Sequence, residues 1–163
     1  MIHAGGCLCS ALRYETLTEP DRITFCHCRF CQRATGSAFM VEPLFRVEDF
    51  RMSKGTPTIY ELKSDGSGKM VKVHFCPTCG TKLYPSFERF SDCYAVYAGT
   101  FDDPDWFAVP PDNTKQIFIS AARPETILHP GIASFQHHAR LNDGTPTQSE
   151  VFARAMRASE LRR

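Results

Sequence analysis

Short stretches of alternating hydrophobic and polar residues follow one another along most of the chain, separated by segments rich in glycine, proline and other turn-forming residues. Alternation over a handful of residues is typical of a half-buried β-strand. The pattern predicts strands at residues 11–18, 22–25, 37–45, 58–62, 70–75, 83–87, 94–98 and 117–120. The segment Ser64–Gly68, which separates two of these strands, predicts a hairpin with a loop longer than two residues. We therefore expect a mostly β fold.

Two segments depart from this strand pattern. Residues 28–35 predict a single short helix, and Gly36 is placed to end it. Near the C-terminus, residues 147–150 (T-Q-S-E) resemble a capping box, and the apolar spacing of residues 151–156 predicts a helix that runs to about Leu161. We expect many short strands, one short helix among the cysteines and one helix at the C-terminus.

Size and charge narrow the class of protein. The chain has 163 residues, of which 42% are hydrophobic and 23% charged, so we expect one ordered domain rather than a disordered chain. Its 19 basic and 18 acidic residues give a net charge of +1 without a long charged run, which argues against a nucleic-acid or membrane partner. The N-terminal residues have neither a basic n-region nor an apolar h-region, so we expect a cytoplasmic location with reduced thiols.

Eight cysteines are many for a chain in a reducing compartment, and their spacing indicates metal binding rather than disulfides. Seven of them fall in three short motifs and the eighth stands alone: Cys7 and Cys9; Cys26, Cys28 and Cys31; Cys76 and Cys79; Cys93. Thiolate clusters select zinc or iron–sulfur clusters among the common metals. We interpret Cys93 as a structural thiol.

The seven clustered thiols divide naturally into four and three. A closed structural zinc site has four protein ligands, whereas a catalytic zinc site has three and keeps one position open. The two cysteine pairs would supply the set of four, and the triplet would hold a second ion by itself. In the alternative division, the triplet and one outside cysteine form one site. A thioredoxin-like redox pair at Cys76 and Cys79 is disfavoured because Gly80 and a strand pattern, not a helix, follow.

Three motifs resemble the glutathione-dependent formaldehyde-activating enzyme family, also called the CENP-V/GFA domain: Gly5-Gly6-Cys7-Leu8-Cys9, Cys26-His27-Cys28-x2-Cys31-Gln32-Arg33 and Phe75-Cys76-Pro77-Thr78-Cys79-Gly80-Thr81. Residues 98–104 match the family pattern as well, so the resemblance covers about residues 3–125. It implies an Mss4-like β fold. We expect a zinc domain of this type at residues 1–130 and a C-terminal extension at residues 131–163, which contains the predicted helix and packs on the same domain. The extension goes beyond the part of the chain that matches.

The resemblance also implies two zinc ions per chain and an activity. A structural zinc is implied at Cys7, Cys9, Cys76 and Cys79, and a second, catalytic zinc at Cys26, Cys28 and Cys31. The implied enzyme is a carbon–sulfur lyase that handles S-hydroxymethylglutathione, with glutathione as co-substrate. Its partners would be a small-molecule thiol and an aldehyde, with no nucleic acid and no membrane; a homodimer is left open.

Residues beside the triplet are candidates for holding the thiol substrate. Arg29 and Arg33 carry charges that suit the carboxylates of a peptide-like thiol, and Thr35 and Gly36 follow them closely. Lys82 is a candidate of the same kind, and ordinary solvated surface is at least as good an interpretation of each of these charged residues. His27 lies between two cysteines, so we expect its side chain to point away from the metal.

Two other kinds of function fit the same sequence. One is a zinc-stabilised binding module without catalysis, and the other is a redox- or metal-sensing protein whose triplet is oxidised reversibly. A purely structural module needs only the four-cysteine site, so the separate triplet favours an enzyme. We expect a zinc-dependent enzyme on this ground.

Overall fold

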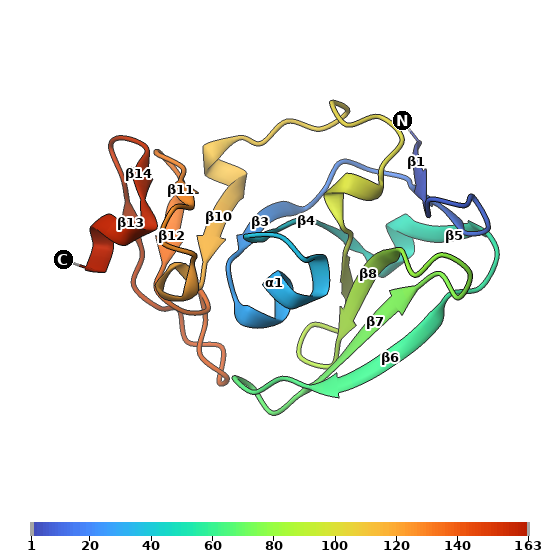
Figure 1. Cartoon of the computed structure of the whole chain (residues 1–163), viewed down its shortest axis with the longest axis horizontal. Helices are drawn as coiled ribbons and strands as arrows, with labels where there is room; N and C mark the ends of the chain where they lie inside the picture. The colour runs from blue at the N-terminus through green and yellow to red at the C-terminus, as the bar shows by residue number, and fades with distance from the viewer. Residues whose placement is uncertain (1, 163) are drawn as a thin grey trace. The chain divides into compact units, whose positions relative to one another are not determined.

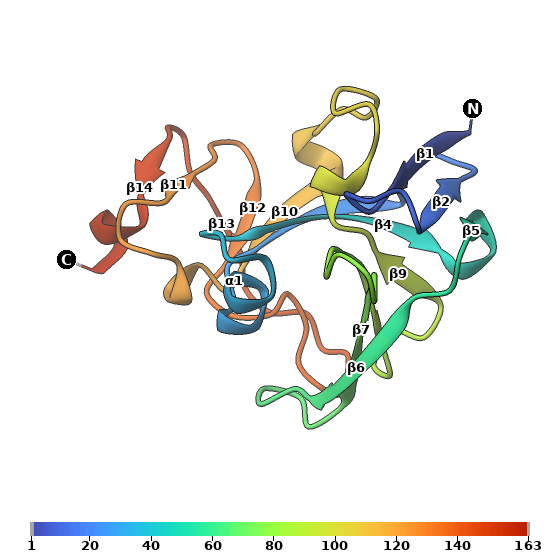
Figure 2. The same ribbon diagram turned by 45° about the vertical axis from the view of Figure 1, so that its right-hand side comes forward.

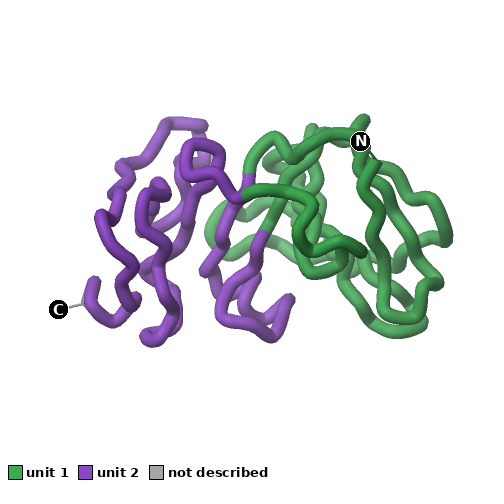
Figure 3. The backbone as a smooth tube through the Cα atoms, turned by 90° about the horizontal axis from the view of Figure 1, so that it is seen from above, with its two compact units in different colours: residues 1–22, 42–108 green, residues 23–41, 109–163 purple. Residues whose placement is uncertain are grey.

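The computed structural model describes residues 2–162 and divides the chain into two compact units (Figure 3). Unit 1 comprises Met1–Arg22 and Glu42–Ala108, and unit 2 comprises Ile23–Val41 and Val109–Arg163. The chain therefore passes between the units after residues 22, 41 and 108. The expected domain boundary at residue 130 stays a prediction.

A three-stranded antiparallel sheet begins unit 1 (Figure 2). Its order is β1-β2-β5, made of β1 (His3–Gly6), β2 (Arg13–Thr16) and β5 (Phe50–Lys54). Only glycine fits at position 5, because a Cβ there would lie 2.3 Å from the hydroxyl oxygen of Tyr14 and 2.5 Å from the carbonyl oxygen of Thr100. The glycine that precedes the first cysteine motif thus lets this strand approach the core.

The other strands of unit 1 form an antiparallel array in the order β4-β9-β8-β7-β6. These strands are β4 (Met40–Arg46, from Glu42 in unit 1), β9 (Cys93–Ala95), β8 (Lys82–Phe87), β7 (Met70–Phe75) and β6 (Thr58–Lys63). In Figure 1, β6, β7 and β8 lie side by side. The short 3-10 helices η1 (Val47–Asp49) and η2 (Ala98–Thr100) complete the unit. The predicted hairpin at 58–75 is confirmed.

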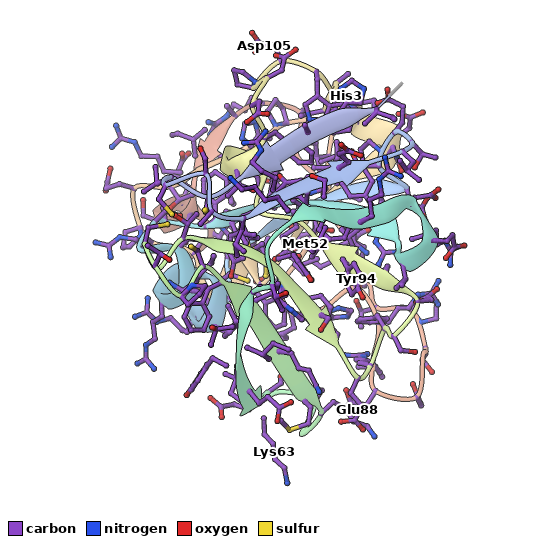
Figure 4. The ribbon with its side chains drawn as sticks, turned by 90° about the vertical axis from the view of Figure 1, so that its right-hand side faces the viewer. His3, Met52, Lys63, Glu88, Tyr94 and Asp105 are labelled. Carbon is purple, nitrogen blue, oxygen red and sulfur yellow. The ribbon has the colours of Figure 1, made fainter. Side chains whose placement is uncertain are left out.

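Aromatic and aliphatic side chains from both sheets pack into one core in unit 1. Tyr14, Phe45 and Leu83 are fully buried there, and the ring of Tyr14 stacks on Phe50 with 5.2 Å between ring centroids. Met52 and Tyr94, both labelled in Figure 4, pack against this core from β5 and β9. Apolar burial of this kind is the main stabilising contribution to a fold.

Unit 2 contains the only α-helix among residues 2–162 and a sheet in the order β13-β12-β10-β3. Its elements are β3 (Arg22–Cys26, from Ile23 in unit 2), α1 (Arg29–Thr35), β10 (Thr114–Ile117), β12 (Ala133–Phe135) and β13 (Glu150–Val151). A second, antiparallel pair joins β11 (Ile127–Leu128) to β14 (Met156–Arg157). The unit also contains short 3-10 helices: η3 (Pro111–Asn113), η4 (Ile119–Ala121) and η5 (Ala158–Arg162).

The mostly β class and the short helix at the central cysteine motif are confirmed. Helix α1 begins one residue later than predicted, and Gly36 ends it in the left-handed conformation with φ 69°. Antiparallel pairs predominate, but β10 runs parallel to both β3 and β12. Among residues 2–162, no helix is long and apolar enough to cross a membrane.

The predicted strand at residues 117–120 is wrong beyond its first residue. The strand ends at Ile117, because Phe118 turns the backbone into the left-handed region with φ 58°. Its N–H then donates to the carbonyl oxygen of His137 at 3.0 Å, and η4 follows. The apolar residues of this segment are nevertheless buried, since Ile117 and Ile119 both lie in the interior.

The predicted C-terminal α-helix at residues 147–161 is also wrong. Glu150–Val151 pairs with β12 and Met156–Arg157 pairs with β11, and only the last residues form a 3-10 helix. The Thr147 hydroxyl, which would cap a helix, donates instead to the carbonyl oxygen of His138 at 2.9 Å. Long-range strand pairing and burial of Met156 against Leu128 outweigh the local helix signal.

Candidate metal centres

Four cysteines from two distant segments of unit 1 meet in one cluster. Cys7 and Cys9 follow β1, whereas Cys76 and Cys79 lie between β7 and β8. The four sulfur atoms all lie within 4.8 Å of one another, with 3.6 Å between those of Cys7 and Cys9 and 3.7 Å between those of Cys9 and Cys76. A tetrahedral site with zinc–sulfur bonds of ~2.3 Å requires sulfur atoms ~3.8 Å apart. The donor set and its spacing therefore fit a structural zinc ion.

Each of these pairs is carried by a tight turn. The carbonyl oxygen of Cys7 accepts from the N–H of Ser10 at 3.0 Å, and that of Cys76 accepts from Gly80 at 2.9 Å. Both accepting turns contain a left-handed residue, with φ 58° at Ser10 and 73° at Gly80. The reversals bring both sulfur atoms of each pair to the same side of the chain. This explains why glycine follows the second motif.

Hydrogen bonds to sulfur favour thiolates in this cluster. The N–H of Leu12 donates to Cys7 Sγ at 3.2 Å, and the Thr81 hydroxyl lies 3.1 Å from Cys79 Sγ. Because that hydroxyl accepts from the N–H of Leu8 at 3.3 Å, its own proton is directed at the sulfur. The Thr81 hydroxyl and N–H lower the pKa of Cys79 to about 5.

The four thiols of this cluster lie close enough to oppose one another's ionisation. The N–H of Ala11 lowers the pKa of Cys9, but its neighbours Cys79, Cys7 and Cys76, together with burial, raise it to about 12. Like charges at this distance disfavour the last ionisation. A cation bound among the four sulfur atoms would offset this repulsion, so the donor set suits a metal ion.

The three remaining motif cysteines form a second cluster within one short segment of unit 2. Cys26 ends β3, Cys28 is the N-cap of α1, and Cys31 lies in the first turn of that helix (Figure 1). Their sulfur atoms all lie within 4.8 Å of one another. Cys26 and Cys31 are buried, whereas Cys28 is partly exposed. Three thiols with one partly exposed member suit a metal that keeps an open coordination position.

Cys28 is the acidic member of this cluster. Hydrogen bonds from the thiols of Cys26 and Cys31, and from the backbone N–H of Cys31 at 3.3 Å, lower its pKa to about 3 against the opposing effect of burial. The helix N-cap geometry therefore places a thiolate where the three sulfur atoms converge. A thiolate is the form of cysteine that binds metals.

His27 belongs to neither cluster. Its ring packs against Phe39, with 4.9 Å between centroids, and neither ring nitrogen has a hydrogen-bond partner among the described residues. Burial first, and then the charge of His129, lower its pKa to about 4, so the imidazole is neutral. This agrees with the expectation that the ring points away from the cysteines.

Four of the residues predicted to contact a thiol substrate lie on or next to α1, whereas Lys82, the fifth candidate, begins β8 in unit 1. Arg29 and Arg33 are exposed and, being four residues apart, share one face of the helix. The Thr35 hydroxyl donates to the carbonyl oxygen of Cys31 at 2.7 Å, and the N–H of Gly36 donates to that of Gln32 at 2.9 Å. Both groups thus hydrogen-bond inside the helix, and the substrate contacts of all four stay predictions.

Two residues in hydrogen-bonding roles escaped sequence reasoning, Thr81 and Gln32. Thr81 joins the two turns of the four-cysteine cluster. Gln32 follows Cys31 and is buried, with its side-chain amide bonded to two backbone carbonyls. Both residues lie within the motifs that carry the family resemblance. The sequence does not show which groups a polar residue in a motif will hydrogen-bond. Cys93 lies outside both clusters, buried in β9.

Comparisons with known proteins agree with the motifs. Residues 2–121 match the family described as glutathione-dependent formaldehyde-activating enzyme. The crystal structure of a Rhodobacter sphaeroides protein has a similar fold, with a TM-score of 0.50 and 23% sequence identity, over 66% of this chain and 97% of that one. At this identity the likeness concerns the fold alone. The sequence match, which spans both cysteine clusters, identifies the chain as a member of the glutathione-dependent formaldehyde-activating enzyme family.

Proposed function

We propose that this protein is a zinc-dependent carbon–sulfur lyase that acts on the adduct of a thiol with an aldehyde. The proposed substrate is S-hydroxymethylglutathione, formed from glutathione and formaldehyde, as the family description suggests. The observation that supports an enzyme is the three-cysteine cluster, which stands apart from the four-cysteine one. A fold that needed only a structural metal would have no use for three further convergent thiols.

Both clusters are proposed to hold zinc, so that each chain binds two ions. Cys7, Cys9, Cys76 and Cys79 would hold the structural ion, and Cys26, Cys28 and Cys31 would hold the catalytic one. When bound by three thiolates, zinc supplies a thiophilic centre with one open position, at which a thiol ionises more readily. The metal type is part of the proposal, because thiolate clusters also suit other soft ions.

The reaction requires little of the protein beyond binding and charge placement. In the breakdown direction the carbon–sulfur bond of the adduct breaks, its electron pair stays on sulfur, and the hydroxyl proton leaves as formaldehyde forms. In the other direction a thiolate adds to the aldehyde carbon. We infer that Arg29 and Arg33 bind the carboxylates of the thiol, since both residues are exposed on one face of α1, close in sequence to Cys28. The guanidinium of Arg29 also donates to the side-chain amide oxygen of Gln32.

The experiment is exchange NMR on an equilibrium mixture of glutathione, formaldehyde and their adduct. Because the adduct forms spontaneously, the signal is a faster exchange rate rather than a product. We expect acceleration by the zinc-loaded protein and its loss in Cys28→Ser. Cys93→Ala is the matched control, since this cysteine lies outside both clusters and should leave the exchange rate unchanged.

Other outcomes point to the alternative functions. If protein shown to carry two zinc ions gives no acceleration, the lyase proposal fails for this substrate pair, and a zinc-stabilised binding module becomes the better interpretation. Reversible zinc loss on mild oxidation, confined to the triplet, would favour a redox sensor instead. A cytoplasmic location and the absence of nucleic-acid and membrane partners stay predictions.

A further inference from the structure

We propose that Gln32 is a positioning residue that holds the three-cysteine cluster in its metal-binding geometry. This inference rests on the proposed metal site at Cys26, Cys28 and Cys31. Gln32 does not supply a ligand, and it acts through the backbone that carries the ligands. Its removal should lower the metal affinity of this cluster alone.

Every hydrogen-bonding group of the Gln32 side chain has a protein partner. The amide nitrogen donates one proton to the carbonyl oxygen of His27 at 2.6 Å and the other to that of Ala121 at 2.9 Å. The amide oxygen accepts from the guanidinium of Arg29. The residue is 5% exposed, and its bond to His27 is buried, so water has little access to that bond. A buried amide with all its groups satisfied holds its neighbours in one arrangement.

The two carbonyl groups fix the segment between the cysteines. His27 stands between Cys26 and Cys28, and its N–H donates to the carbonyl oxygen of Ile117 in β10 at 3.0 Å. With its own carbonyl held by Gln32, both backbone groups of His27 are engaged. The N–H of Gln32 also donates to the carbonyl oxygen of Cys28 at 3.0 Å. Gln32 therefore holds two successive carbonyls of the cysteine segment.

The second carbonyl anchors this segment to another part of unit 2. Ala121 ends η4, which follows the strand that pairs with β3. The amide of Gln32 thus links the cysteine segment to the chain after β10. The bonds of Cys28 with the N–H groups of Cys31 and Gln32 are local, at the start of a seven-residue helix, so the link to Ala121 and the bond from His27 to Ile117 connect this segment to distant parts of the unit. A short helix is too weak by itself to fix its N-terminal turn.

Glutamine is the side chain that meets these demands at this length. Methionine has a similar shape but no donor, and it would remove the bond to the buried carbonyl of His27 and the bond to the partly buried carbonyl of Ala121. Asparagine keeps the amide but is one methylene shorter. Residues that orient the ligands of a metal site change its affinity by ~10–100-fold when they are removed. We expect an effect of this size for Gln32→Met.

The test is metal binding, with the four-cysteine cluster as an internal reference in the same molecule. Competition with a chelator measures the zinc affinity of each site, and Cys28→Ser identifies which site is the triplet. Cobalt loaded in place of zinc gives a thiolate charge-transfer band that reports ligand geometry. For Gln32→Met we expect ~10–100-fold weaker binding and an altered cobalt band at the triplet, with the four-cysteine site unchanged.

Two further variants separate the role of the amide donors. Arg29→Ala removes only the partner of the amide oxygen and should leave the triplet affinity within about threefold. Gln32→Asn keeps an amide at this position and should disturb the fold less than Gln32→Met does. It should also weaken metal binding at the triplet, because the shorter side chain cannot reach both carbonyl oxygens.

The outcomes distinguish this proposal from the one on which it rests. If the wild type binds a single metal ion and Cys28→Ser does not change that number, the three-cysteine metal site is absent, and both proposals fail. If the wild type binds two ions and both Gln32 variants match it in affinity and cobalt spectrum, only the Gln32 proposal fails. Equal weakening of both sites would mean a general loss of folding, and it would also overturn a positioning role.

Discussion

The two cysteine clusters are built in opposite ways. In the four-cysteine cluster, Cys9 and Cys76 touch across 67 residues of sequence, so the cluster closes a long loop. In the three-cysteine cluster all ligands come from residues 26–31, and closing it fixes only one local segment. Closing a long loop has a large entropic cost, which a bound metal offsets. The first cluster is therefore expected to determine whether unit 1 folds, and the second to determine what the protein does.

The clusters also differ in the number of thiols that the chain supplies and in their exposure to solvent. The first cluster consists of four thiols, and its sulfur atoms accept hydrogen bonds from the turn segments and from Thr81. Three thiols surround the second, and Cys28 is partly exposed. A closed shell suits a structural ion and an open one suits chemistry. This contrast can be tested from the largest expected effect to the smallest.

Cys76→Ser should have the largest effect, because it removes a fully buried thiol from the cluster that joins two distant segments. Structural zinc contributes on the order of 10 kcal/mol to the folding of small zinc-dependent domains, which equals the whole stability of a typical protein. We expect aggregated or unfolded protein. Circular dichroism and gel filtration measure this.

Cys28→Ser is the matched substitution in the other cluster and should leave the chain folded. We expect two zinc ions per chain in the wild type, one in Cys28→Ser, and a thermal unfolding midpoint close to that of the wild type. Elemental analysis and calorimetry give both quantities. A folded Cys76→Ser protein, or an unfolded Cys28→Ser protein, would contradict the division of roles.

Thr81→Val should sharpen the comparison with an intermediate effect. It removes the hydroxyl that joins Leu8 N–H to Cys79 Sγ while keeping the size of the side chain. A hydrogen bond to a charged group contributes ~1.5–3 kcal/mol, and the bond to Cys79 is only partly buried, so we expect release of the structural zinc to a chelator to be ~10-fold faster. Thr81→Ser retains the hydroxyl and should behave like the wild type. Equal rates of zinc release from the wild type and both variants would show that the Thr81 hydroxyl does not stabilise the site.

His27→Leu should have the smallest effect on folding and none on metal content. The ring makes no hydrogen bond to a described residue and packs against Phe39, so an apolar side chain of similar volume fits the same place. Volume-conserving replacements of this kind change the free energy of unfolding by less than about 1.5 kcal/mol. Chemical denaturation and zinc analysis check this. A variant with one zinc ion instead of two would make His27 a ligand.

Local patterns explain why so much of the fold was predictable. The hairpin β6–β7 and helix α1 depend on residues near in sequence, such as the alternation before residue 64 and the glycine at position 36. Phe118 shows the limit of that reasoning: its left-handed backbone, bonded to His137, ends a strand in the middle of an apolar run. Nothing near it in the sequence predicts that turn.

The C-terminal segment shows the same limit more strongly. Its capping-box pattern is a true local signal, yet residues 150–151 and 156–157 pair with strands that lie more than fifteen residues earlier in the chain. A two-residue pairing has no sequence signature of its own. Helix propensity amounts to a few tenths of a kcal/mol per residue, so burial and ladder hydrogen bonds easily outweigh it.

The sequence by itself determined the family, the mostly β class and the identity of the seven clustered thiols, because short motif spacing survives any arrangement of the rest of the chain. The motif spacing and the family resemblance also predicted the division of these thiols into four and three, and the structure shows the same two clusters. Only the tertiary structure decided which polar groups support them. Thr81 and Gln32 acquire their roles from partners brought close by folding, Leu8 for one and Ala121 for the other. A hydrogen bond depends on where both partners lie, and a linear sequence specifies only one of them at a time.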